Sequence, residues 1–121
     1  MDEHNRGDAP SKTRIQIDLL PGELERMNIV MRMTGLTTRK ELFNNALSFF
    51  EWAVSEVARG KEIGAVTSDE KITTLTMPAF QTAAHYGRRP DFEDVQRVVA
   101  EAVEEDKGAA SPRNIQVLEA E

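Results

Sequence analysis

The stretch Thr13–Leu19 alternates apolar and polar side chains, and this alternation limits what the whole chain can fold into. One side carries Ile15, Ile17 and Leu19, and the other carries Arg14, Gln16 and Asp18. A period of two predicts a half-buried β-strand. Two helical patterns follow, so no second strand stands close by in the sequence. Because buried backbone donors and acceptors need partners, we expect the same strand of a second copy to supply them.

A ribbon of two such strands, antiparallel about a two-fold axis, has two chemically different faces. The face formed by Ile15, Ile17 and Leu19 is expected to pack on the helices. The opposite face presents polar side chains from both copies. A two-stranded ribbon fits the major groove of DNA, where Arg and Gln make bidentate hydrogen bonds to guanine and adenine. The residues predicted to read bases are Arg14, Gln16 and Asp18.

Two helices are expected after the strand. The first runs from about Pro21 to Thr34, with Pro in its first turn and Gly35 as its stop. The second begins at Thr38, where Thr38-Arg39-Lys40-Glu41 fits a capping box.

The second helix is apolar around most of its circumference, so it should be buried on more than one side. We expect the first helix to cover one side and a second copy of the chain to cover another. The predicted dimer core consists of Ile15, Ile17, Leu19, Phe43, Leu47 and Phe50.

This order of elements resembles the ribbon-helix-helix family of DNA-binding proteins, the Arc and MetJ type. The resemblance covers somewhat less than half of the chain and rests on Arg14–Pro21, on Gly35-Leu36 and on Thr38–Leu47. It implies a mainly α fold with a short β-ribbon between two subunits, and docking of that ribbon in the major groove.

The resemblance also implies that the start of the second helix clamps a DNA phosphate. That role falls on Thr38, Arg39 and Lys40, and Lys12 is a further candidate for a phosphate contact. Asp18 departs from the family pattern, which has a neutral or basic residue there. It either accepts a hydrogen bond from a cytosine amino group or pairs with a nearby Lys or Arg.

The chain is expected to divide into four parts. Residues 1–12 form a flexible arm, 13–59 the ribbon-helix-helix domain, 60–80 a β-hairpin extension, and 81–121 an acidic segment, partly helical and partly disordered. The hairpin strands are predicted at Glu62–Val66 and Lys71–Met77, and it should dock on the helices or bind a partner because an isolated hairpin is marginal in water. A further helix is predicted from Asp91 to Asp106 by an apolar stripe at helical spacing.

The net charge of −6 is unusual for a DNA-binding protein, and its distribution is uneven. Residues 1–64 carry 9 Lys and Arg against 10 Asp and Glu, while residues 65–121 carry 6 against 11. Any positive surface in the first half is therefore local. This lowers the expected non-specific affinity for DNA, since neutralisation of phosphates supplies most of that affinity.

Several classes of function are disfavoured. The chain has no cysteine, no nucleophile and base in a recognisable arrangement, no glycine-rich phosphate loop and no metal-ligand spacing. We therefore expect no enzyme activity, no cofactor and no metal. No apolar run has the length of a membrane span, and the polar start is no signal peptide, so a cytoplasmic protein is expected.

The sequence favours a sequence-specific DNA-binding homodimer that regulates transcription as a repressor, with dimers associating on double-stranded DNA. An alternative is an antitoxin, whose N-terminal half binds operator DNA and whose acidic stretch Asp91–Asp106 lays its apolar stripe in a groove of a toxin. A second alternative is a dimeric assembly module that does not bind DNA, an idea favoured by the near-neutral first half and by Asp18.

Overall fold

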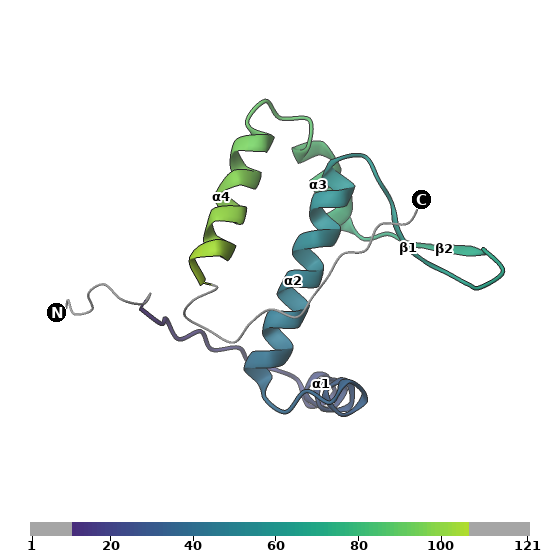
Figure 1. Cartoon of the computed structure of the whole chain (residues 1–121). Helices are drawn as coiled ribbons and strands as arrows, with labels where there is room; N and C mark the ends of the chain where they lie inside the picture. The colour runs from purple at the N-terminus through teal and green to yellow at the C-terminus, as the bar shows by residue number, and fades with distance from the viewer. Residues whose placement is uncertain (1–10, 107–121) are drawn as a thin grey trace. The chain divides into compact units, whose positions relative to one another are not determined.

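The structure is a computed structural model that describes residues 11–106, so most of the expected N-terminal arm and the tail from Lys107 lie outside the described residues. This range is mainly helical, as predicted, with one small antiparallel sheet. Its elements are α1 (Pro21–Thr34), α2 (Arg39–Ala58), β1 (Ile63–Val66), β2 (Ile72–Leu75), α3 (Pro78–Tyr86) and α4 (Phe92–Asp106) (Figure 1). Two compact units divide the chain. Among the described residues, the first consists of residues 11–46 with Glu105 and Asp106, and the second of Leu47–Glu104.

Helix α1 begins and ends at the predicted residues. The Leu20 N–H donates a hydrogen bond to the Glu23 carboxylate over 2.9 Å, which satisfies one backbone donor before the first turn. Gly35 follows the helix in the left-handed region, at φ 76°, and its N–H donates to the Met31 carbonyl. No residue of α1 is buried.

Residues 11–20, which precede α1, form no strand in the described chain. Ile15 and Ile17 are 75% and 70% exposed, and Leu19 is 39% exposed. The expected packing of these side chains on the helices is therefore not made within one chain. Because the expected pairing needs a second copy, the ribbon stays a prediction.

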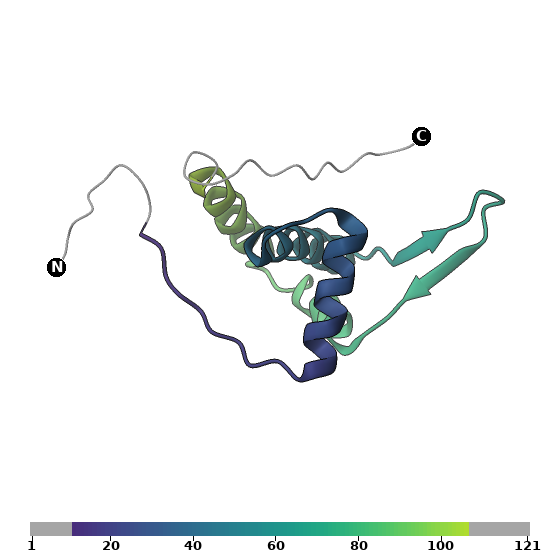
Figure 2. The ribbon, with the colours of Figure 1, turned by 90° about the horizontal axis from the view of Figure 1, so that it is seen from below.

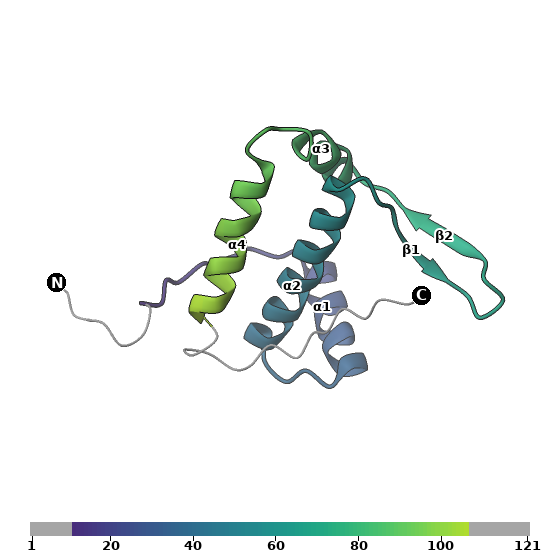
Figure 3. The same ribbon diagram turned by 45° about the horizontal axis from the view of Figure 1, so that its top comes forward.

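The second half of α2 supplies the core of the second unit. Ala53 and Val57 of α2 are buried together with Ile63 at the start of β1 and with Phe80 and Ala83 of α3. Helix α3 lies beside the end of α2 (Figures 1 and 3). The stacked rings of Phe50 and Phe80 extend this contact, with their centroids 6.2 Å apart.

Helix α3 was not predicted from the sequence. The hairpin extension was expected to run to residue 80, and the segment that follows was expected to be helical only from Asp91. In the structure Met77 is extended and Pro78 opens the helix, a position that suits proline because its missing N–H has no helical acceptor there. The helix has only nine residues, so its apolar period repeats too few times to stand out in the sequence.

The hairpin forms as predicted, with each strand slightly shorter than expected. The strands pair in antiparallel register from Ile63↔Leu75 to Val66↔Ile72. Figure 2 shows the two strands extending away from α2 and α3. Only Ile63 of the eight strand residues is buried, so the hairpin is anchored at its base and does not dock along its length on the helices.

Helix α4 matches the predicted C-terminal helix, and its start contacts α3 and the end of α2. Phe92 is buried, the Arg59 guanidinium pairs with Glu93 over 3.0 Å, and Gln96 donates to the Ser55 hydroxyl over 2.7 Å. The first turns of this helix therefore belong to the second unit.

Gly87→Ala tests how closely the end of α3 approaches α2. Gly87 has ordinary right-handed helical dihedrals, but a Cβ there would overlap the carbonyl oxygen of Ala58. Because a backbone group cannot swing away as a side chain does, we expect a loss of about 1–3 kcal/mol in the free energy of unfolding measured in urea. Gly22→Ala in α1 is the matched control, since nothing lies within 4 Å of its added Cβ. It should be neutral or stabilise by about 0.4–1 kcal/mol, and equal effects of both changes would contradict the close approach.

Candidate nucleic-acid interface

The predicted base-reading residues lie on the segment before α1. Arg14, Gln16 and Asp18 are all exposed, and so is Lys12. The apolar residues between them, Ile15 and Ile17, are among the most exposed large hydrophobic side chains of the described chain. One segment therefore presents both the candidate reading side chains and an uncovered apolar set.

The start of α2 has the predicted capping box. The Glu41 N–H donates to the Thr38 hydroxyl over 3.0 Å, and the Glu41 carboxylate accepts from the Thr37 and Thr38 N–H groups over 2.9 and 3.1 Å. These bonds hold the chain at the angle at which α2 begins. The N–H of Thr37, then that of Thr38, lowers the pKa of the Glu41 carboxyl from its ordinary value, because both stabilise the carboxylate.

The same geometry decides which donors an anion can reach. Glu41 already occupies the N–H groups of Thr37 and Thr38. The N–H groups of Arg39 and Lys40 come next, in the first turn, where an α-helix has no internal acceptors. These donors and the helix dipole suit a phosphate, although the Glu41 carboxylate offsets part of the positive potential.

The two basic side chains of this turn are held in different ways. The Arg39 guanidinium donates to the Asn28 side-chain carbonyl on α1 over 3.3 Å. An arginine has five N–H donors, so this bond orients the side chain and leaves donors for a phosphate. The Lys40 ammonium lies 5.9 Å from the centre of the Phe43 ring, at the range of a cation–π contact.

The helical residues of the predicted dimer core follow one face of α2 at spacings of four and three. Phe43, Leu47 and Phe50 are 48%, 39% and 41% exposed. Phe50 also stacks on Phe80 of its own chain, so part of its ring already has a partner, which the sequence did not reveal. Phe49, which is 57% exposed, widens the uncovered apolar surface of this helix.

The arginines of the loop after α3 are engaged within the second unit. Arg89 makes two hydrogen bonds of 3.0 Å to Asp91 and lies over the Tyr86 ring at 4.6 Å. Its bonds lower the pKa of the Asp91 carboxyl. Arg88 contacts the His85 ring nitrogen at 2.9 Å. The loop therefore offers less free positive charge than its sequence suggests.

A depression of about 380 Å³ in the second unit is lined by the ends of α2 and α3 and the start of α4. Its charged lining residues are Arg59, Arg88 and Glu93, and the first and last of these form an ion pair with each other. No arrangement of unpaired polar groups at this depression suggests a ligand. Within residues 11–106, no cluster of side chains has the makeup of a metal site.

Comparisons of the chain with protein-family models, with curated proteins and with solved structures give no significant match. Among the helices of the described residues, none combines the length and the apolar character that a membrane crossing requires.

Glu41→Gln tests the cap at the start of α2. The pKa of Glu41 is lowered in the folded chain, so its stabilising effect is present above the ordinary value of 4.5 and is lost as the pH falls through the lower folded pKa. We expect the variant to melt at a lower temperature than the parent at neutral pH. The difference should vanish in acid, where the parent carboxyl is also neutral. Glu25→Gln on the exposed face of α1 makes the same charge change and is the control. A difference that persists unchanged in acid would contradict the role of the carboxylate.

Proposed function

We propose that this protein is a sequence-specific DNA-binding homodimer that represses transcription by inserting a two-stranded β-ribbon into the major groove. The observation that carries the proposal is the segment 11–20. It precedes two well-formed helices, alternates polar and apolar side chains, and leaves Ile15 and Ile17 mostly exposed. Pairing with the same segment of a second copy gives its backbone and its apolar side chains partners at once.

Energetics indicate what such a dimer needs. Fully burying one Ile side chain contributes about 1.5–3 kcal/mol, whereas association costs on the order of 4–15 kcal/mol in lost freedom. Four isoleucines from two ribbons do not reliably exceed that cost. The dimer therefore also requires the exposed face of α2, including Phe43 and Leu47.

Base contacts and phosphate contacts have separate roles in this proposal. Arg14 and Gln16 read base edges, and the start of α2 fixes the register on the backbone through Thr38, Arg39 and Lys40. Few basic residues take part and the chain is acidic overall. Non-specific binding should consequently be weak, and discrimination should depend on the ribbon.

The antitoxin is a second candidate function, and one part of helix α4 supports it. The start of this helix is already engaged in the second unit, where Phe92 is buried beside the Tyr86 ring and the Arg59 guanidinium, so only its later turns are available for a toxin. Val98 is 62% exposed and Val99 is 38% exposed, and these residues provide the apolar surface that a groove requires. The alternative of an assembly module keeps the dimer and assigns Asp18 to ion pairing.

A DNA titration separates reading residues from positioning residues. With DNA from upstream of the gene and a scrambled control, Gln16→Ala should reduce discrimination by about 1–3 kcal/mol, because a bidentate base contact is lost. Arg39→Ala should weaken binding to both fragments and flatten the salt dependence. Arg97→Ala on α4 removes the same charge outside the interface and is the control. Equal loss on both fragments in Gln16→Ala would remove Gln16 from the base contacts, and no preference in the parent would favour the assembly module.

Ile17→Lys tests whether a second copy covers the ribbon. Ile17 is 70% exposed in the single chain, so the change should alter stability little if the chain acts alone. In the proposed dimer it places a charge in a buried face, and both the melting temperature and its dependence on protein concentration should fall. Met33→Lys on α1, at a residue 79% exposed, is the matched control. Identical behaviour of the two variants would contradict the shared core.

A further inference from the structure

The hairpin is an exposed structural element that the proposed DNA-binding unit does not use. It extends away from α2 and α3 (Figures 2 and 3). Val66 and Ile72 form a cross-strand pair and are 67% and 71% exposed, and Leu75 at the end of β2 is 48% exposed. Such a pair on an unsupported two-stranded sheet indicates a surface that another element covers.

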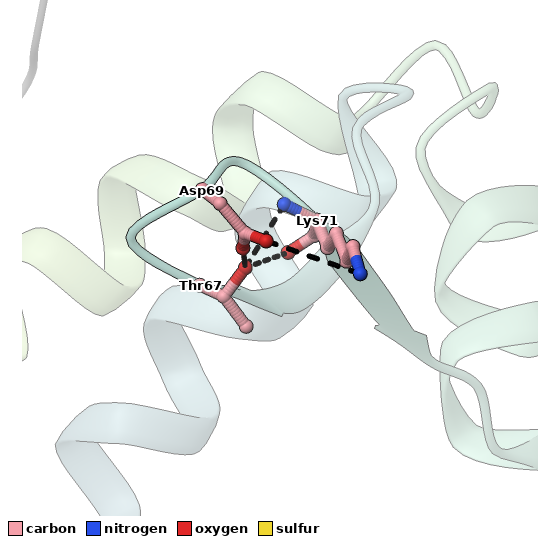
Figure 4. A network of polar contacts seen from close by, with 3 residues as sticks. All are labelled: Thr67, Asp69 and Lys71. Atoms are coloured by element: carbon pink, nitrogen blue, oxygen red, sulfur yellow. Dashed lines mark hydrogen bonds and ion pairs between the residues drawn. The ribbon is translucent and has the colours of Figure 1, made fainter.

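The hairpin turn is fixed by local contacts, so the two strands keep their paired arrangement before any partner binds. The Lys71 N–H donates to the Thr67 hydroxyl over 3.0 Å, the Thr67 N–H donates to the Lys71 carbonyl over 2.8 Å, and the Thr67 hydroxyl donates to the Asp69 carboxylate (Figure 4). The Lys71 ammonium lies 3.9 Å from the same carboxylate. The positive charge nearest the strands is thus paired inside the turn.

The outer edge of β2 has backbone groups that point away from β1. The position of the Thr73 carbonyl oxygen shows this, since a Cβ at Gly64 would overlap it, which places that oxygen on the side of β1. The described chain has no cis peptide bond. In a trans peptide the next N–H points the opposite way, so the Thr74 N–H faces outward. Within the described residues the sheet has two strands only, and this edge has no neighbour.

Apart from the short length of β2, which has four residues, the edge lacks the features that normally keep exposed strands from pairing. Exposed edges in native proteins are usually protected by charged side chains, by proline or by a bulge. The eight residues of β1 and β2 include no charged residue and no proline, in a chain of which 30% is charged. Between the two strands, β2 is the better template, because its sequence Ile-Thr-Thr-Leu favours pairing while β1 contains Gly64.

We infer that the β2 edge of the hairpin binds the β2 edge of a second copy of this chain. Identical edges pair antiparallel about a two-fold axis, so one patch suffices for a closed contact. Because neither edge carries charge, the two copies meet without repulsion. Four residues a side form an interface below the ~1,200 Å² of a stable complex, so the contact is weak and adds to other contacts. If the proposed DNA-binding dimer exists, this edge joins one dimer to the next, a consequence that rests on the proposed function.

Sedimentation velocity of the full chain without DNA tests the inference, with Thr74→Pro as the main variant. Proline removes the outward N–H and leaves the bonds to β1 in place. The average sedimentation coefficient of the parent should rise with protein concentration, and the last rise should be a weak association step that needs high concentration. Thr74→Pro should weaken that step about tenfold, because two backbone hydrogen bonds are lost, one from each copy. Thr74→Ala keeps the N–H and should associate as the parent does.

A second variant guards against a folding defect. Ile72→Lys keeps every backbone donor and places like charges on both edges, so it should also abolish the weak step. Circular dichroism shows whether each variant is folded. If Thr74→Pro does not fold, the association of Ile72→Lys decides the test. A parent with no concentration-dependent step, or an unchanged step in the folded variants, would overturn the inference. Because DNA is absent, failure of the DNA-binding proposal leaves this result unaffected.

Discussion

Helix α2 carries more apolar surface than the described chain covers. Its second half buries Ala53 and Val57 against the base of the hairpin and α3. Toward its start, Phe43 remains 48% exposed and lies beside Lys40. In the proposed dimer a second copy covers the exposed face of α2, because large apolar side chains in one contiguous stripe are rarely left in water.

The same requirement explains why the candidate interface combines polar and apolar groups so closely. Ile15 and Ile17 alternate with Arg14 and Gln16, so burying the first pair necessarily directs the second pair outward. The capping box at Thr38 and Glu41 fixes the first turn of α2 by local bonds alone. In the proposed function, the site for a phosphate at that turn would therefore be prepared within one chain, whereas base reading would depend on assembly.

The sequence predicted the elements whose signals are local. Helix α1 was located to the residue by Pro21 and Gly35, and α2 by the cap at Thr38; the hairpin and α4 were located to within a few residues. Helix α3 was missed because a helix of nine residues repeats the helical spacing of apolar residues too few times to be recognised after a strand. The contact of Phe50 with Phe80 was missed for the same reason, since it depends on a helix that was not expected. The proposed ribbon differs from these elements, because its pairing would lie between two chains and the structure of one chain does not test it.

Charge places a further limit on how the proposed dimer works. An acidic chain with a few local cations gains little from phosphates and cannot hold DNA by electrostatics alone. Its affinity for an operator must then come from the ribbon and from contacts between dimers. The loop arginines do not fill the gap, since Arg89 is bound to Asp91. In the proposed function, a weak, uncharged contact such as the β2 edge would supply what is missing, because dimers side by side on DNA would meet at a high effective concentration and each would stabilise its neighbour there.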